Sequence, residues 1–265
     1  MGEMPTSAIA ERALSAGGGP RIAIVECGLR DGEPAVDLAA VLSREERTRA
    51  ARRVPEAARR AVASRGRLRL LLGRLLEADP AAIELAAGPF GKPMLAGRWA
   101  ERLHFNVTHA GDRWLVAFSP TVPVGVDLEL RTDRHTPDWA ALMAGSILTE
   151  AEQLRDRNRI DVETLLDVWV AKEAVLKAIG TGIGDVLRSL TLPERVPRHA
   201  LAADGSICSV MLAAVATPAA GGASLAAAHL MLEPGAHAAI ACAADCCRLS
   251  RHAWDDAFRD GLSLG

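Results

Sequence analysis

The spacing of apolar residues divides the chain into short strands and two long helices. The apolar run RIAIVECGL, residues 21–29, predicts a buried strand. The segment LSREERTRAARR follows from Leu42, and its serine is placed to cap a basic helix. A second helix is predicted over residues 56–76, where the many arginines fit a solvated basic face.

A second set of strands follows the turn GPFGKP at Gly88. The alternating segments LHFNVTHAG and WLVAFS, which start at Leu103 and Trp114, predict an antiparallel hairpin around Gly111 and Asp112. PVGVDLEL, residues 123–130, predicts a further strand. The last third of the chain predicts strands around residues 207–215, 224–232 and 236–243.

The order of elements repeats along the chain. LTEAEQLR from Leu148 predicts another capped helix, and residues 161–179 predict another long helix. Matching Ser43 to Thr149 gives an offset of roughly 106 residues. The repeat predicts an α+β fold of two similar halves related by a pseudo-twofold axis, residues 20–122 and 123–265, after a frayed tail at residues 1–19. The cleft between the halves is the expected ligand site.

Composition narrows the class of protein. The 31 basic and 33 acidic residues give a net charge of −2, which provides no reason to expect a nucleic-acid or membrane partner. The apolar region 211–232 is broken by proline and glycine and is too weak for a membrane span. The odd count of five cysteines indicates reduced thiols in a cytoplasmic protein. Metal binding by Cys242, Cys246 and Cys247 is a minor alternative, because their spacing is not that of a zinc site.

The strand GVDLEL carries two carboxylates on one face. Asp127 and Glu129 lie about 7 Å apart along a strand, opposite the apolar residues Val126 and Leu128. An amphipathic strand with a charged, wet face gives the same pattern, so this observation alone is weak.

Glu173 strengthens the case for a site. On a helix it falls in the middle of an apolar stripe that includes Leu166, Trp169 and Leu176. A buried carboxylate is costly unless a proton, a cation or a metal compensates it. A salt bridge to Lys177 is the simpler explanation. If the helix packs on the GVDLEL strand, however, three carboxylates converge, and oxygen ligands of this kind favour magnesium.

Basic and hydroxyl side chains surround this acidic group in the predicted fold. They are Lys172, Lys177, Thr108, His109, Lys92 and the arginines of the first half. Magnesium with surrounding cations is typical of phosphoryl chemistry, which indicates a polyphosphate substrate. A structural role for His109 and a solvated helix flank for the two lysines remain open alternatives.

The motifs together resemble those of the 4′-phosphopantetheinyl transferases of the surfactin-activating (Sfp) type. The resemblance rests on G-x-D-x-E at Gly125 to Glu129 and on W-x-x-K-E-A-x-x-K at Trp169 to Lys177, followed by AIGTGI. GPFGKP and FNVTHAG stand upstream in the matching order, so the resemblance spans roughly residues 42–184.

The resemblance implies a monomer that binds coenzyme A and Mg²⁺ between its halves. It implies that Asp127, Glu129 and Glu173 hold the metal and that Lys172 and Lys177 lie near the diphosphate. It further implies coenzyme A contacts from Thr108, His109, Lys92, Arg49 and Arg65, the two arginines as candidates for the 3′-phosphate. The sequence departs from the family pattern at Thr108, Ala110 and Glu46, where the family commonly has serine, a small polar residue and, in some members, a base.

The expected activity is transfer of the 4′-phosphopantetheine arm of coenzyme A to a serine of an apo carrier protein, with release of 3′,5′-ADP. In this expectation Glu173, directly or through water, helps to deprotonate the serine while the lysines stabilise the leaving diphosphate. The carrier is expected from polyketide, nonribosomal-peptide or fatty-acid synthesis. Two alternatives stay open: a non-catalytic module that binds coenzyme A or a carrier protein, and a magnesium phosphohydrolase.

Overall fold

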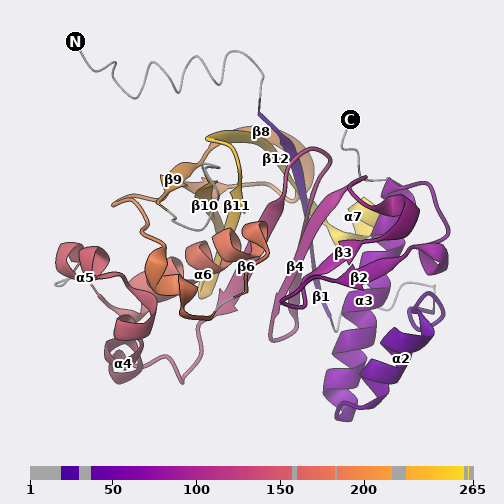
Figure 1. Cartoon of the computed structure of the whole chain (residues 1–265), viewed down its shortest axis with the longest axis horizontal. Helices are drawn as coiled ribbons and strands as arrows, with labels where there is room; N and C mark the ends of the chain where they lie inside the picture. The colour runs from indigo at the N-terminus through magenta and orange to yellow at the C-terminus, as the bar shows by residue number, and fades with distance from the viewer. Residues whose placement is uncertain are drawn as a thin grey trace.

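The structure, a computed structural model, describes residues 19–29, 37–156, 160–182, 184–216, 225–259 and 262. Two β-sheets pack face to face, and a long helix covers the outer face of each sheet (Figure 1). The fold is therefore α+β, as the sequence predicts. Residues 1–18 of the expected tail lie outside the described residues.

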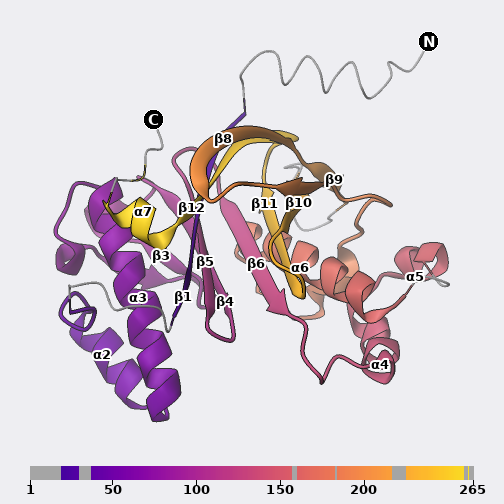
Figure 2. The ribbon, with the colours of Figure 1, turned by 180° about the vertical axis from the view of Figure 1, so that it is seen from behind.

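The first sheet has the strand order β4-β5-β1-β12-β8. Its strands are β1 (Arg21–Gly28), β4 (His104–Ala110), β5 (Arg113–Ser119), β8 (Asp204–Met211) and β12 (Cys246–Ala253). The predicted hairpin is β4 and β5, which are antiparallel. At the centre of the sheet, β1 pairs antiparallel with β5 and parallel with β12, which comes from the far end of the chain (Figure 2).

The second sheet has the order β6-β11-β10-β7, and β9 also pairs with β10. Its strands are β6 (Val124–Leu130), β7 (Arg198–Ala200), β9 (Ala213–Val215), β10 (Leu225–Met231) and β11 (Ala236–Cys242). A separate two-stranded ribbon, β2 (Leu85–Ala87) with β3 (Pro93–Leu95), carries the GPFGKP turn.

The helices repeat as the sequence predicts. Each long helix, α3 (Pro55–Leu75) or α6 (Val162–Ile179), follows a short one, α2 (Arg44–Ala51) or α5 (Glu150–Asp156). Ser43 and Glu46 form a capping box at α2, and Thr149 and Glu152 form the same reciprocal pair of hydrogen bonds at α5. The remaining elements are α4 (Pro137–Ile147), α7 (Trp254–Arg259) and the short 3-10 helices η1 (Pro80–Ala82), η2 (Gly97–Trp99) and η3 (Gly184–Ser189).

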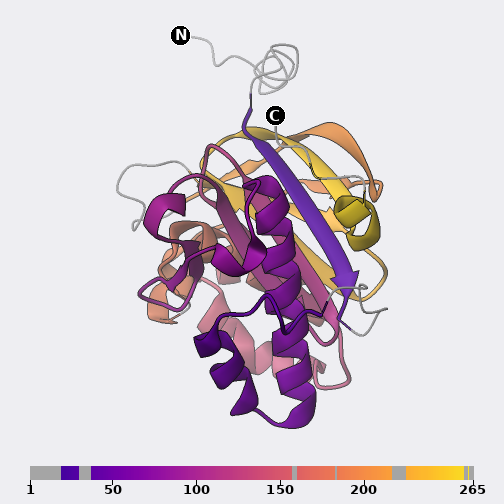
Figure 3. The same ribbon diagram turned by 90° about the vertical axis from the view of Figure 1, so that its right-hand side faces the viewer.

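Three apolar cores hold the layers together. Leu71 of α3 packs with Trp114 and Phe118 of the first sheet, which α3 crosses on its outer side (Figure 3). The inner faces of the two sheets bury residues such as Ile24 and Ile240 against each other. Between α6 and the second sheet, the strand residues are largely alanines, so the helix can approach the sheet closely.

Gly125 sets the distance between α6 and β6. A Cβ atom there would lie 1.9 Å from the carbonyl oxygen of Ala174 and 2.4 Å from the nitrogen of Ala178. Only glycine permits this approach. Because alternate residues of a strand share a face, Asp127 and Glu129 also point toward α6.

The expected division of the chain at residue 122 does not separate the two sheets. β8, β12 and α7 lie after that boundary, yet β8 and β12 pair within the first sheet and Trp254 of α7 packs on its core. The five cysteines, all within the described residues, form no disulfide. Within the described ranges, no helix is both long enough and apolar enough to cross a membrane.

Candidate active site

The candidate site lies where edge strand β4 of the first sheet meets edge strand β6 of the second. The side-chain oxygen of Asn106 accepts a hydrogen bond from the backbone N–H of Val126, at 2.8 Å. Two residues along, Thr108 Oγ1 donates to Asp127 Oδ1 at 3.1 Å. All three polar side chains are at least nine-tenths buried, so these bonds fix the two strands relative to each other.

Helix α6 presents a row of side chains four residues apart to this seam. Lys177 Nζ pairs with Asp127 Oδ1 and donates to Thr108 Oγ1 at 3.4 Å. Trp169, two turns earlier on α6, is partly buried against the core between α6 and the second sheet. Glu173 lies between them and is only 2% exposed. The predicted packing of the Glu173 helix on the strand of Asp127 and Glu129 is therefore confirmed.

Burial and neighbouring negative charges disfavour the ionised form of the carboxylates at this site. Burial and then the charge of Asp127 raise the pKa of Glu173 to about 7, although Lys177 opposes the shift. Burial and Asp127 also raise the pKa of Glu129, against Lys177 and Trp169. Among the described residues, Asp127 Oδ2 and Glu173 Oε1 are buried oxygens without a hydrogen-bond partner. Buried oxygens without a hydrogen-bond partner favour a bound cation or a proton.

The donor chemistry of these carboxylates fits magnesium, which prefers oxygen ligands. No three His, Cys, Asp or Glu side chains lie in metal-binding geometry in the part of the chain that the structure describes. The three carboxylates expected to share an ion are thus not preassembled, and the ammonium of Lys177 occupies one oxygen of Asp127.

Lys92 ties the GPFGKP turn to the same region. Its ammonium donates to the carbonyl oxygens of Lys177, near the end of α6, and of Val124, at the start of β6. Burial and the charge of Lys177 lower the pKa of Lys92 to about 8. Lys92, Glu173 and Lys177 line one cleft of about 410 Å³, together with Phe90 and Asn106. Lys92 therefore lies at the expected site while bonding backbone carbonyls.

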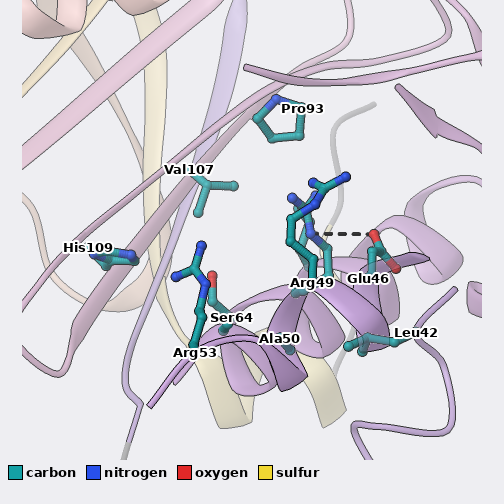
Figure 4. A pocket seen from close by; sticks show the side chains of 12 residues that line it. Leu42, Glu46, Arg49, Ala50, Arg53, Ser64, Pro93, Val107 and His109 are labelled. Carbon is teal, nitrogen blue, oxygen red and sulfur yellow. Dashed lines mark ion pairs between the residues drawn. The ribbon is translucent and has the colours of Figure 1, made fainter. Parts of the chain in front are cut away.

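A second cavity, rich in arginine, lies between α2, α3 and β4. Figure 4 shows Arg49, Arg53 and His109 around it, with the ion pair between Glu46 and Arg65 dashed. Arg65 Nε lies 3.4 Å from Glu46 Oε1, and Arg49 pairs with Glu45. Burial lowers the pKa of Arg65, opposed by Glu46. Arg53 has no ion-pair partner among the described residues.

The two cavities adjoin, because Pro93 and Val107 line both. On β4, Thr108 faces the carboxylates while its neighbour His109 faces the arginine cavity. The predicted site residues thus divide into a carboxylate cleft with Lys92, Glu173 and Lys177, and an arginine cavity with Arg49, Arg65 and His109.

The expectation that Lys172 lies near the diphosphate is corrected by the structure. Lys172 Nζ is fully buried, 2.6 Å from Glu152 Oε2, and also donates to the carbonyl oxygens of Ile147 and Leu187. Burial lowers the pKa of Lys172, opposed by Glu152. The reason is helical phase, since residues 172 and 173 project about 100° apart. Lys172 joins α6 to α5 and stays out of the cleft.

Two residues of the site were not predicted. Asn106 links the strands, and Arg53 lines the arginine cavity. Asn106 is the polar residue between Phe105 and Val107 in a strand buried on both sides, which is a signal that the sequence carries. Arg53 follows the end of α2, where the sequence gives no pattern to distinguish it from its neighbour Arg52.

Comparison with known proteins identifies relatives of this chain. Residues 123–208 match the family described as the 4′-phosphopantetheinyl transferase superfamily. The chain is 40% identical over 151 residues to 4′-phosphopantetheinyl transferase HetI of Nostoc sp., covering 56% of this chain and 63% of the relative. It is 35% identical over 192 residues to a phosphopantetheinyl transferase of Thraustochytrium sp., covering 64% of each.

A human relative is more distant. The chain is 31% identical over 144 residues to human L-aminoadipate-semialdehyde dehydrogenase-phosphopantetheinyl transferase, covering 50% of this chain and 46% of the relative. The chain covers less than two thirds of the length of each of these three relatives. The matched family segment contains Asp127, Glu129, Glu173 and Lys177. Over these segments the chain is similar to members of the 4′-phosphopantetheinyl transferase superfamily.

Proposed function

We propose that this protein is an Sfp-type 4′-phosphopantetheinyl transferase, which moves the phosphopantetheine arm of coenzyme A to a serine of an apo carrier protein. The reaction breaks the diphosphate linkage of coenzyme A, forms a phosphodiester to the serine oxygen and releases 3′,5′-ADP. The substrates under this proposal are coenzyme A and an acyl or peptidyl carrier protein of polyketide, nonribosomal-peptide or fatty-acid synthesis.

The proposal depends mainly on one observation. Glu173 and Lys177 of α6 face Asp127 of β6 where the edges of the two sheets meet. A buried acid without a full set of hydrogen bonds lies beside a lysine that lines the same cleft. A binding module has no need of such a costly group of charges. An enzyme that transfers a charged group does, because the charges stabilise its transition state.

Coenzyme A has chemistry that suits the two adjoining cavities. Its 3′-phosphate matches the arginine cavity, where Arg49, Arg53, Arg65 and His109 provide cationic or hydrogen-bonding groups. Its diphosphate matches the neighbouring cleft, where Lys177 and Lys92 can neutralise charge. Thr108 lies between Lys177 and Asp127 and adds a hydroxyl donor.

Proton transfer is assigned to Glu173. In this proposal Glu173 helps to remove the proton from the carrier serine, directly or through water. Lys177 then stabilises the negative charge of the leaving 3′,5′-ADP. Lys172 has no part in this proposal, because its ammonium is bonded to Glu152 and two carbonyls.

Magnesium is the metal proposed for this site, held by Asp127, Glu129 and Glu173. The unpaired oxygens of Asp127 and Glu173 support this assignment. A bound divalent ion would offset the negative charge of the diphosphate while its linkage is broken.

The test is incubation of the protein with coenzyme A, Mg²⁺ and an apo carrier protein, followed by intact mass of the carrier. A transferase adds a phosphopantetheine arm to the carrier and produces 3′,5′-ADP. A binding module changes neither substrate, and a phosphohydrolase degrades coenzyme A while the carrier keeps its mass. A panel of apo carriers in the same assay identifies the preferred partner.

A further inference from the structure

The three arginines that line the arginine cavity differ in what already holds them. Arg49 pairs with Glu45, and Arg65 Nε lies 3.4 Å from Glu46 Oε1. Among the residues that the structure describes, the side chain of Arg53 forms neither an ion pair nor a hydrogen bond. An anion that binds Arg53 therefore displaces no carboxylate of the described chain from it.

The short connection between α2 and α3 places Arg53 at the cavity. Its backbone N–H donates to the carbonyl oxygen of Ala50 at 3.0 Å, which keeps the chain close to the end of α2. In Figure 4 its side chain extends between those of His109 and Arg49. The neighbouring Arg52 does not line the cavity. Two adjacent, exposed arginines thus differ in their relation to this site.

Glu46 offsets the positive charge of the other cavity-lining arginine on α3. Its carboxylate lies 2.7 Å from Arg69 Nε, pairs with Arg65 and accepts the backbone N–H of Ser43. Burial alone would raise the pKa of Glu46, but these hydrogen bonds and the charges of Arg69 and Arg65 lower it. Glu46 also lines the cavity, so an anion near Arg65 would meet a negative charge beside it.

We infer that Arg53 is the main specificity-determining residue for the 3′-phosphate of coenzyme A, and that Arg65 acts chiefly to hold Glu46. A guanidinium can donate two parallel hydrogen bonds to one phosphate, and each is strengthened by charge. The inference deepens the proposed function and rests on it, because it takes the arginine cavity as the site of the 3′-phosphate.

The experiment compares coenzyme A with dephospho-coenzyme A by isothermal titration calorimetry on the full chain. For Arg53→Gln we expect the affinity for coenzyme A to fall about 10-fold or more, because a charged hydrogen-bond donor is lost. The affinity for dephospho-coenzyme A should change much less. Arg53→Lys keeps the charge without the planar fork and should recover part of the loss. Arg52→Gln is the matched control, which removes the same charge one residue away and should change neither affinity.

A double-mutant cycle tests the part assigned to Glu46. Glu46→Gln removes the charge that holds Arg65 and keeps a side chain that can complete the capping box. Arg65 then becomes available to a phosphate, so Arg53→Gln should cost less affinity for coenzyme A in this background than in the wild type. Melting temperatures monitor folding. If Glu46→Gln does not fold, Arg65→Gln replaces it and should reduce the preference for coenzyme A less than Arg53→Gln does.

The outcomes separate the inference from the proposed function. If the wild type prefers coenzyme A and Arg53→Gln keeps that preference, the inference is wrong and the proposed transfer stands. An equal loss with Arg52→Gln, or an equal loss for both ligands, would overturn it too. Equal costs of Arg53→Gln in the two backgrounds would contradict the part assigned to Glu46. If the wild type binds neither ligand, the proposed function itself fails.

Discussion

The ammonium of Lys172 lies 2.6 Å from the carboxylate of Glu152, and both side chains are fully buried. Lys177, five residues later on the same helix, reaches the cleft and pairs with Asp127 instead. Two lysines of one motif thus have different surroundings, and their replacement should have different effects.

Lys172→Met should lower stability far more than it lowers intrinsic transfer activity. It leaves the Glu152 charge buried without its counter-charge, and breaking one side of a buried pair typically costs about 3–5 kcal/mol. Urea unfolding measures this loss. The double variant Lys172→Met with Glu152→Leu should recover part of it, because the remaining charge is also removed.

Lys177→Met should lower transfer activity more than it lowers stability. Its side chain is 28% exposed, so we expect a smaller loss of stability, but transfer should fall by about 100-fold or more as one electrostatic group is removed. A Lys172 variant that kept full stability and lost transfer alone would contradict the assignment of these two lysines.

Gly125→Ala should destabilise the protein strongly. The new methyl would have to displace the backbone of α6 at Ala174, and overpacking of this kind typically costs about 1–3 kcal/mol or more. Gly145→Ala is the matched control. A Cβ at Gly145, in α4, meets nothing within 4 Å, and the change should be neutral or stabilising by up to about 1 kcal/mol. Equal melting temperatures for the two variants would refute the close packing of α6 on β6.

Glu173→Gln should fold, melt at or above the wild type without divalent ions, and lose transfer by about 100-fold or more. The stability gain has a defined pH dependence. The pKa of Glu173 is raised from 4.5, its ordinary value, to about 7 in the folded protein. The raised pKa therefore contributes fully to the stability of the wild type below pH 4.5, where Glu173 is protonated in both the folded and the unfolded state. That contribution is lost as the pH rises through about 7.

Glutamine does not titrate, so the melting temperature of Glu173→Gln relative to the wild type should increase between pH values below 4.5 and above about 7. Differential scanning calorimetry across this range checks the sign. A difference that stayed constant with pH would show that Glu173 does not carry the shifted pKa. Near-normal transfer by the folded variant would show that Glu173 has no part in the proposed mechanism.

Arg65→Ala should raise the KM for coenzyme A more than it lowers kcat. A group that binds a remote phosphate acts about equally in the ground and transition states. The sharper measurement compares coenzyme A with dephospho-coenzyme A, and the preference for coenzyme A should shrink in the variant. Arg60→Ala, on the same helix but paired with Asp112, is the control. An unchanged preference would remove Arg65 from the 3′-phosphate assignment.

Local signals in the sequence predicted the helices and strands that determine the site. The two capping boxes, at Ser43 and Thr149, mark helix starts through hydrogen bonds three residues apart, which the sequence displays directly. Glu173 stood out because a charge in an apolar stripe needs compensation. Helical phase would also have excluded Lys172 from the cleft, since its neighbour Glu173 already faced inward.

Non-local features could not be predicted in this way. The pairing of β1 with β12 depends on residues from the two ends of the chain, and no local pattern encodes a partner that distant. Helix α4 is a local feature that was not predicted, although Thr136 caps it and Trp139, Met143 and Ile147 recur at helical spacing. The contact between Asn106 and Val126 also depends on how two sheet edges meet.

The position of β12 beside β1 has a consequence for biosynthesis. The side chains of Glu26 and Arg251, on these adjacent strands, bond across 225 positions of the chain. A nascent chain on the ribosome can form the β4–β5 hairpin and α3 early, but β1 then presents an open backbone edge until the last strand emerges. Closing a contact of such high sequence separation is slow. Strand β12, residues 246–253, therefore completes the first sheet late in synthesis, and release of the chain before that point would leave an aggregation-prone edge exposed.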